Sequence, residues 1–438
     1  MTIEVEPRLI FELKTDNKQT SPRIASLKLS SISLECPHLS VSTHLGSVPH
    51  LTHDLVQRHL PQLTAFHLHL QDFYTASDRP PPFTHAPCDL HRYIGLSTGS
   101  HLLSMGARPP PPAQTSLRPN TDYSITIQPQ FGTMQLHIDD FIHSSLARPP
   151  DLLFAMADHP YHPNPGTNRL VKSLDRSFRW LSNLTRSAEG KTHVFAELVG
   201  STNPILVEAF SRELQMRPLD PDQSTPTGPT TPLSKLADHL AGYVYPLSAL
   251  RASLPFDSIL PLICLAFTPL PLHKPRIIHG PRGPLEILHL IRSTGVDLFI
   301  DEWTSEISSV GIALAFEFPP SPHSPSNAPI GWNLYDERFA QDFDKLTLPA
   351  SAPPTKAYIH HLLHTHEMSA HVYLSLHNHA AMSNFLGSVR ETLKAGPEAF
   401  EEAVENFEKA YSVPDSLECA AREAWRVVKT ARGKGRQK

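Results

Sequence analysis

The chain has 438 residues, enough for one large barrel domain with additions or for two ordinary domains. Its formal charge of −5 excludes a generally basic nucleic-acid-binding protein, although local basic patches remain compatible with it. Hydrophobic residues make up 40% of the chain, which supports a sizeable core, and the 44 prolines predict many stiff loops.

The first part of the chain predicts strands. Residues 22–34 alternate apolar and polar side chains, which is typical of an antiparallel strand pair or meander. Residues 151–158 form a short, continuous apolar run that ends in the carboxylate of Asp158. Such a run predicts a parallel strand that is buried on both faces.

The middle of the chain alternates helices with strands. Apolar residues at helical spacing predict a helix over 168–187, and residues 193–200 predict the next strand. A second helix is expected over 204–216, because Pro204 suits its first turn. Residues 216–234 then become rich in Pro, Thr, Asp and Ser, which predicts a disordered insertion.

Three further strands are expected at 241–246, 275–280 and 296–300, with a helix over 284–292 between the last two. This strand–helix alternation predicts an α/β fold of the (β/α)8 TIM-type barrel class. The strands at 22–34 predict an N-terminal β-meander beside the barrel.

The C-terminal part predicts a helical subdomain, with helices at 382–393, 399–411 and 417–429. A second Pro/Ser-rich insertion is expected near 319–329. The expected organisation therefore has three parts, which are N-terminal strands over 1–40, a barrel over 41–345 and a helical subdomain with a basic tail over 346–438.

Cysteine usage indicates a reducing compartment. The four cysteines are far apart in sequence and contain no Cys-x-x-Cys pair: Cys36, Cys88, Cys264 and Cys419. The N-terminus is acidic and lacks the apolar segment of a signal peptide. The apolar run at 259–267 is too short to span a bilayer and contains a proline, so we expect a soluble, intracellular protein.

Several segments resemble one known family. They are Gly-Ser-Val-Pro-His-Leu-Thr-His-Asp over 46–54, Gly-Val-Asp-Leu-Phe-Ile-Asp over 295–301, the His-His-Leu…Glu-Met stretch over 358–368 and Leu-His-Asn over 376–378. Together they resemble the tRNA-guanine transglycosylase family over roughly residues 40–395. The first segment resembles the family's non-catalytic eukaryotic branch in particular.

The resemblance implies a site that has lost its nucleophile. In catalytic members, a carboxylate at the end of the Val-Asp-Met-Phe-Asp segment attacks the ribose carbon and holds tRNA covalently. Ile300 stands at that place in this chain. Asp301 follows it, but adjacent side chains of a strand point to opposite faces, so a simple replacement by Asp301 is not expected.

Two other parts of the family's site differ. The nearest counterpart of the Asp-Ser-Gly-Gly-Phe-Gln segment is 96–100, which has neither the Asp nor the paired glycines. The base-reading Gln-Gly-Gly turn corresponds to Val199-Gly200-Ser201, where the Gln is missing. Asp158 matches the Asp that recognises the incoming base. Because the pocket partners are absent and capping carboxylates are common, we favour the interpretation that Asp158 caps the next helix or pairs with Arg169 or Arg176.

The family also implies structural zinc, held by a Cys-x-Cys-x-x-Cys cluster and one downstream His. His377 matches that His, but residues 346–355, where the cluster should lie, contain no cysteine. One ligand cannot form a closed site. The nearby histidines could contribute imidazoles, or they could pack and hydrogen-bond within a helix: His360, His361, His364, His366, His371 and His379. A deletion or a gene-model error at 348–355 would also explain the missing cluster.

The resemblance predicts a partner subunit, not a self-sufficient enzyme. It implies a heterodimer with a catalytic homologue that exchanges guanine for queuine at the wobble position of tRNAs with GUN anticodons. It also implies a cytoplasmic location, with peripheral association at the mitochondrial outer membrane as a family property. The basic tail at 422–438 is compatible with tRNA phosphate contacts or with a frayed terminus. Two alternatives are an active transglycosylase that uses Asp301 and a tRNA-independent scaffold on a degenerate barrel.

Overall fold

A closed barrel of parallel strands forms the first part of the fold, as predicted. The computed structural model describes residues 9–14, 22–77, 79–109, 118–160, 165–219, 234–251, 254–323, 325–346 and 353–434. The strands close in the order β10-β11-β12-β13-β4-β5-β6-β9. Their bounds are β4 His38–Ser42, β5 Ala65–His69, β6 Leu102–Gly106, β9 Leu152–Phe154, β10 His193–Glu197, β11 Gly242–Pro246, β12 Arg276–His279 and β13 Leu298–Asp301.

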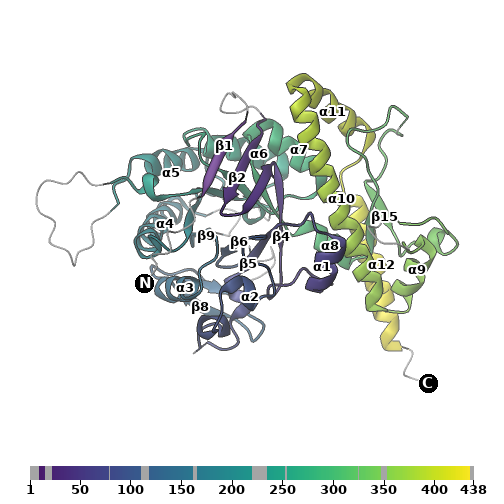
Figure 1. Ribbon diagram of the computed structural model, residues 1–438, viewed down its shortest axis with the longest axis horizontal. Helices are drawn as coiled ribbons and strands as arrows, with labels where there is room; N and C mark the ends of the chain where they lie inside the picture. The colour runs from purple at the N-terminus through teal and green to yellow at the C-terminus, as the bar shows by residue number, and fades with distance from the viewer. Residues whose placement is uncertain are drawn as a thin grey trace, which may run out of the picture. The chain divides into compact units, whose positions relative to one another are not determined.

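Amphipathic helices connect these strands and lie around the barrel (Figure 1). They are α3 Ile138–Ala147, α4 Thr167–Ala188, α5 Pro204–Met216 and α6 Phe256–Phe267. A further helix, α7 Gly283–Thr294, links β12 to β13 in the sequence. The predicted helix over 204–216 is confirmed with the same bounds. It starts there because the Asn203 side chain accepts hydrogen bonds from the amides of Ile205 and Leu206, while Pro204 occupies the first turn.

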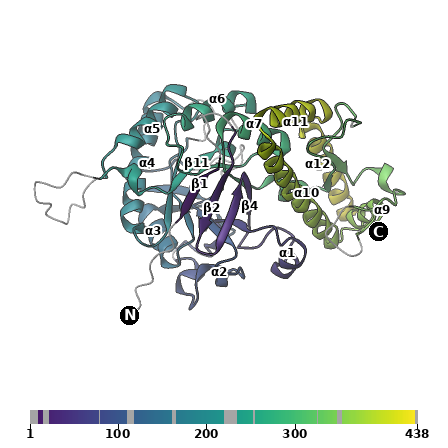
Figure 2. The ribbon, with the colours of Figure 1, turned by 45° about the horizontal axis from the view of Figure 1, so that its top comes forward.

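The predicted N-terminal meander is an antiparallel sheet. It contains β1 Ile10–Leu13, β2 Ala25–Leu29 and β3 Ile32–Cys36, paired in the order β1-β2-β3 (Figure 2). Its buried apolar face shares one hydrophobic core with residues that begin the barrel strands, including Ala65, Leu102 and Leu298. The sheet therefore covers the amino-terminal mouth of the barrel, so the carboxyl ends of the strands are the place to look for a site.

A buried ion pair joins this sheet region to the barrel. The guanidinium of Arg23 donates from Nε to Oδ1 of Asp297 over 3.0 Å, and both side chains are about fully buried. Asp297 also accepts a 2.7 Å hydrogen bond from the backbone amide of Arg276. The Asp of the Gly-Val-Asp-Leu-Phe segment thus has a structural role at the start of β13.

The chain divides into two compact units. Unit 1 comprises residues 1–46, 64–280 and 290–300, and unit 2 comprises 47–63, 281–289 and 301–438. The elements within unit 2 are α1 His53–His59, α8 Trp303–Ser309, β14 Ile312–Leu314, β15 Gly331–Asn333, α9 Lys356–His364, α10 Met368–Ala395, α11 Pro397–Ala410 and α12 Asp415–Lys434. The predicted helices at 382–393, 399–411 and 417–429 correspond to α10, α11 and α12, and α10 is longer than expected.

The structure describes one of the two Pro-rich insertions almost completely and the other only at its ends. Most of the first, residues 220–233, lies outside the described residues, while the second is described apart from residue 324. The described helices include none with the length and apolar character needed to cross a membrane.

Candidate base-exchange site

Ile300 lies inside the barrel near the carboxyl end of β13. Its side chain is fully buried and belongs to the hydrophobic core that also contains Leu298 and Ile277. In the strand register, Ile300 pairs with His279 at the end of β12. The inward-facing position where the family places its nucleophile is therefore occupied by a hydrocarbon side chain that cannot attack a ribose.

Asp301 is the last residue of β13 and lies two residues before the start of α8. Its Oδ1 accepts a 3.1 Å hydrogen bond from the backbone amide of Thr304, which leads into α8. The side chain is buried, and this burial raises the pKa of the Asp301 carboxyl to about 6. Oδ1 of Asp301 thus holds the first turn of α8, whereas Oδ2 is buried and has no hydrogen-bond partner among the described residues. The alternative of a displaced nucleophile at Asp301 stays a prediction.

Asp158 is the centre of a buried polar cluster in unit 1. Arg169 donates two hydrogen bonds to its carboxylate, at 2.6 and 2.7 Å, and Arg176 donates a third at 3.0 Å. Asn120 donates a fourth at 2.7 Å. Burial acts to raise the pKa of Asp158, but the hydrogen bonds from Arg169 and Asn120 and the charge of Arg169 hold it below its ordinary value.

The ion pairs expected for Asp158 are thus both present. Its side chain is fully buried, and its oxygens already accept four hydrogen bonds. A purine edge would have to displace one of the arginines or Asn120 to reach this carboxylate. The role of Asp158 in base recognition stays a prediction without geometric support.

The turn that corresponds to the base-reading segment packs tightly. Gly200 has φ +148°, and a Cβ added there would lie 2.5 Å from Cα of Val207 in α5. The hollow beside this turn, lined by His159, Ser201 and Tyr245 among others, has a volume of about 10 Å³. That space holds about one water molecule and is far too small for a purine base.

The segment at 96–100 lies at the wrong end of the barrel. It directly precedes β6, whereas barrel sites are formed at the carboxyl ends of strands. The expectation that it is the counterpart of the Asp-Ser-Gly-Gly segment is therefore wrong. The residue at the carboxyl end of β6 is Gly106.

His377, the expected zinc ligand, lies in α10 and is buried. Its Nε2 donates a 2.7 Å hydrogen bond to the carbonyl oxygen of Leu314 in β14. The neighbouring Asn378 accepts from the Leu314 amide at 2.8 Å and donates to the carbonyl of Ile312 at 2.8 Å and to Ser308 Oγ at 2.9 Å. The His-Asn signature therefore joins α10 to β14.

These residues do not fit the family's Cys₃His zinc site. The sequence has no cysteine between Cys264 and Cys419, and residues 347–352 lie outside the described part of the chain. Within the described residues, no group of three or more potential metal ligands includes His377. Of the neighbouring histidines, His360 donates from Nδ1 to the carbonyl of Leu334 over 2.9 Å, which supports the interpretation of a packed helix.

The basic tail is helical as far as residue 434. Arg422 lies 3.3 Å from Glu306 and 3.6 Å from Glu418, and Lys429 lies over the ring of Trp425. The described part of the tail thus forms a helix and contacts side chains of its own unit. Contact between the tail and tRNA stays a prediction.

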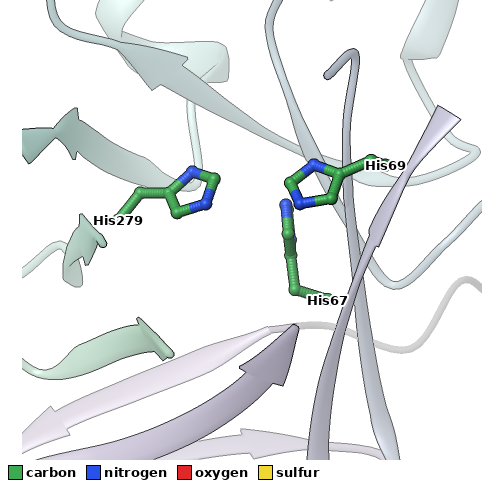
Figure 3. A group of neighbouring side chains, drawn as sticks. All are labelled: His67, His69 and His279. Atoms are coloured by element: carbon green, nitrogen blue, oxygen red, sulfur yellow. The ribbon is translucent and has the colours of Figure 1, made fainter. Parts of the chain in front are cut away.

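The residues that the sequence analysis missed are three buried histidines. His67 and His69 lie on β5 and His279 lies on β12, and their side chains meet inside the barrel (Figure 3). A signal was present in the alternating His-Leu-His sequence, which places two imidazoles on one face of a strand. The third histidine is distant in sequence, and only barrel closure brings it close.

The fold and this site define a transglycosylase-type barrel whose nucleophile position is apolar. The family model described as queuine tRNA-ribosyltransferase matches residues 17–413. The chain belongs to this family.

Three relatives of the chain share one name. The chain is 27% identical to a queuine tRNA-ribosyltransferase accessory subunit 2 of Schizosaccharomyces pombe, over 89% of this chain and 81% of the relative. It is 26% identical to the accessory subunit 2 of Pongo abelii and 25% identical to that of Homo sapiens, in each case over 84% of this chain and 91% of the relative.

Proposed function

We propose that this chain is the non-catalytic subunit of a queuine tRNA-ribosyltransferase. In this proposal it assembles with a catalytic homologue that exchanges guanine for queuine at the wobble position of GUN-anticodon tRNAs. The observation that carries the proposal is the buried Ile300 at the position of the nucleophile. The name accessory subunit 2, which the similar proteins have in common, agrees with it.

Two further features support a non-catalytic role. The space beside the Val199–Ser201 turn has no room for a base, and the carboxylate of Asp158 is already occupied by arginines. Base exchange needs a nucleophile and a pocket that holds the leaving and the incoming base. The described part of this barrel provides neither at the positions that the family uses.

The role proposed for the chain is to complete the dimer and to position tRNA. A tRNA anticodon arm needs a wider surface than one barrel presents, and a second barrel of the same family would extend it. We propose the cytoplasm as the site of this assembly, with peripheral association at the mitochondrial outer membrane. No step of this proposal depends on zinc, because the residues of this chain do not fit the family's zinc site.

A covalent trap tests which subunit holds the tRNA. The carboxylate nucleophile displaces guanine from the ribose, so the catalytic chain becomes linked to tRNA until the incoming base displaces the carboxylate. The two subunits, mixed with labelled GUN-anticodon tRNA and an incoming base that reacts slowly, are separated on a denaturing gel. We expect label on the catalytic homologue alone. Label on this chain, lost in Asp301→Asn, would establish the active-enzyme alternative instead.

A further inference from the structure

The barrel interior contains a histidine cluster that the proposed function does not use. His67, His69 and His279 are 1%, 4% and 6% exposed. In the barrel order, β5 and β12 are separated by β13 and β4, so these side chains reach one another only through the interior. Residues i and i+2 of a strand share a face, which explains why both His67 and His69 point inward.

The three rings offer nitrogen atoms at nearly the spacing of a metal site. One ligand nitrogen of each histidine lies within 4.8 Å of the corresponding nitrogen of the other two. Tetrahedral zinc with Zn–N bonds of about 2.0–2.1 Å requires nitrogens about 3.3 Å apart. The three nitrogens must therefore approach one another by up to about 1.5 Å when the ion binds.

Serine hydroxyls orient two of the rings. His67 Nδ1 lies 2.8 Å from Ser104 Oγ, and Ser104 donates its own proton to the carbonyl of Phe66 over 3.3 Å. Metal binding through Nε2 of His67 requires the tautomer in which Nδ1–H donates to Ser104 Oγ, and donation by Ser104 to Phe66 is compatible with that tautomer. His69 Nε2 lies 3.2 Å from Ser42 Oγ, which directs Nδ1 of His69 toward a metal.

A glycine lies next to the cluster. Gly106 pairs with His69 in the strand register, and a Cβ built on it would lie 3.4 Å from Nε2 of His67. Glycine thus keeps a side chain away from this nitrogen. Three histidines are the protein ligand set of zinc sites that retain a bound water or another exchangeable ligand as the fourth ligand.

We propose that this cluster binds one divalent transition metal ion, with zinc as the expected ion, through His67 Nε2, His69 Nδ1 and one nitrogen of His279. Imidazole ligands suit zinc and neighbouring first-row ions and do not suit Mg²⁺ or Ca²⁺. The site is distinct from the family's Cys₃His zinc site, which lies in the C-terminal part of the sequence. It does not rest on the proposed function, since it is derived from the barrel geometry alone.

A second group of potential ligands provides the control. Glu337, His360 and His364 also lie within 4.8 Å of one another, in unit 2. The Glu337 side chain there is 87% exposed, and exposed acidic groups of this kind are common without a metal. Asn substituted for His364 therefore removes a histidine without touching the barrel cluster.

Zinc titration of the full chain tests the proposal. The metal-stripped chain is titrated with ZnCl₂ against a chelating dye, and Co²⁺ replaces zinc to report coordination through its visible absorption. We expect one equivalent of zinc, a dissociation constant below about 1 μM and a four-coordinate Co²⁺ spectrum. The double variant His67→Asn/His279→Asn is expected to bind at least about 100-fold more weakly, and His364→Asn is expected to bind like the unsubstituted chain.

A second variant keeps the test independent of folding. Ser104→Ala retains all three ligands but loses the hydroxyl that selects the His67 tautomer, so affinity should fall roughly 10–100-fold. Zinc should also raise the thermal midpoint of the unsubstituted chain and not that of the double variant. Absence of zinc binding, or binding that His364→Asn abolishes while Ser104→Ala leaves it unchanged, would overturn the proposal.

Discussion

Replacing Asp158 by Asn tests whether its carboxylate stabilises the fold or recognises a base. The substitution keeps the shape of the side chain and removes the charge that Arg169 and Arg176 share. Breaking a buried ion pair by removing one partner costs about 3–5 kcal/mol. Here the lower end applies, because Arg169 is 31% exposed and Arg176 retains Asp122 as a partner at 2.7 Å.

A loss of about 3 kcal/mol corresponds to a change of roughly a hundredfold in the opening equilibrium. Hydrogen exchange measured by mass spectrometry reports the opening of each segment separately. A local measurement is needed because a chain of two compact units need not unfold in one step. We expect amide protection to fall about a hundredfold in β9, β10 and α4. The matched control is Asp175→Asn, an exposed position on α4 that should change protection little.

The effect should depend on pH in a defined direction. The Asp158 pKa is lowered in the folded chain, so the ion pairs stabilise the fold fully above the unfolded-state pKa of about 3.9. That stability is lost as the pH falls through the folded pKa, and the difference between the two proteins should shrink there. Unchanged protection in Asp158→Asn at neutral pH, together with weakened binding of queuine or of tRNA, would refute the structural interpretation.

Three further substitutions test other parts of the account. Arg23→Met leaves Asp297 buried without its guanidinium and should destabilise unit 1 by about 3–5 kcal/mol in urea unfolding, whereas Lys14→Met at an exposed pair should cost less than about 1 kcal/mol. Asn378→Ala removes three buried hydrogen bonds and should destabilise unit 2 by about 2–4 kcal/mol, with exposed Asn384→Ala as its control in thermal unfolding. Burial raises the pKa of Asp301 to about 6, so its neutral carboxyl contributes stability that is complete below pH ~4 and is lost as the pH rises through 6. Asp301→Asn should remove this pH dependence of stability. The same substitution should leave base exchange by the two-subunit complex unchanged.

Much of the barrel could be predicted from the sequence because apolar residues recur with a different period in its helices and in its strands. The helix at 204–216 carried both its cap and its first-turn proline, so its bounds could be predicted. Strands β4, β5 and β6 were not predicted, since all three contain histidine or serine among their buried residues. Local patterns do not reveal that a polar side chain points into a barrel.

The sequence predicted the candidate site only at the position of the nucleophile, where the type of a single residue determines whether attack on the ribose can occur. Ile300 could be interpreted from its place in a motif, and the structure adds that it is buried in the core. The partners of Asp158 were expected among Arg169 and Arg176, but Asn120 comes from a loop whose position the sequence does not specify. The spacing of His67 and His69 indicated two imidazoles on one strand face, but His279 lies more than two hundred residues away, so no spacing rule could indicate the third ligand.

The most direct test of the central claim is exchange of labelled guanine into GUN-anticodon tRNA. The reaction is measured with this chain alone, with its catalytic homologue alone and with an equimolar mixture of the two. The account predicts activity in the mixture that exceeds the activity of the homologue alone, and none from this chain. Exchange by this chain alone would contradict the assignment built on Ile300, and a mixture no more active than the homologue would favour a scaffold without a tRNA role.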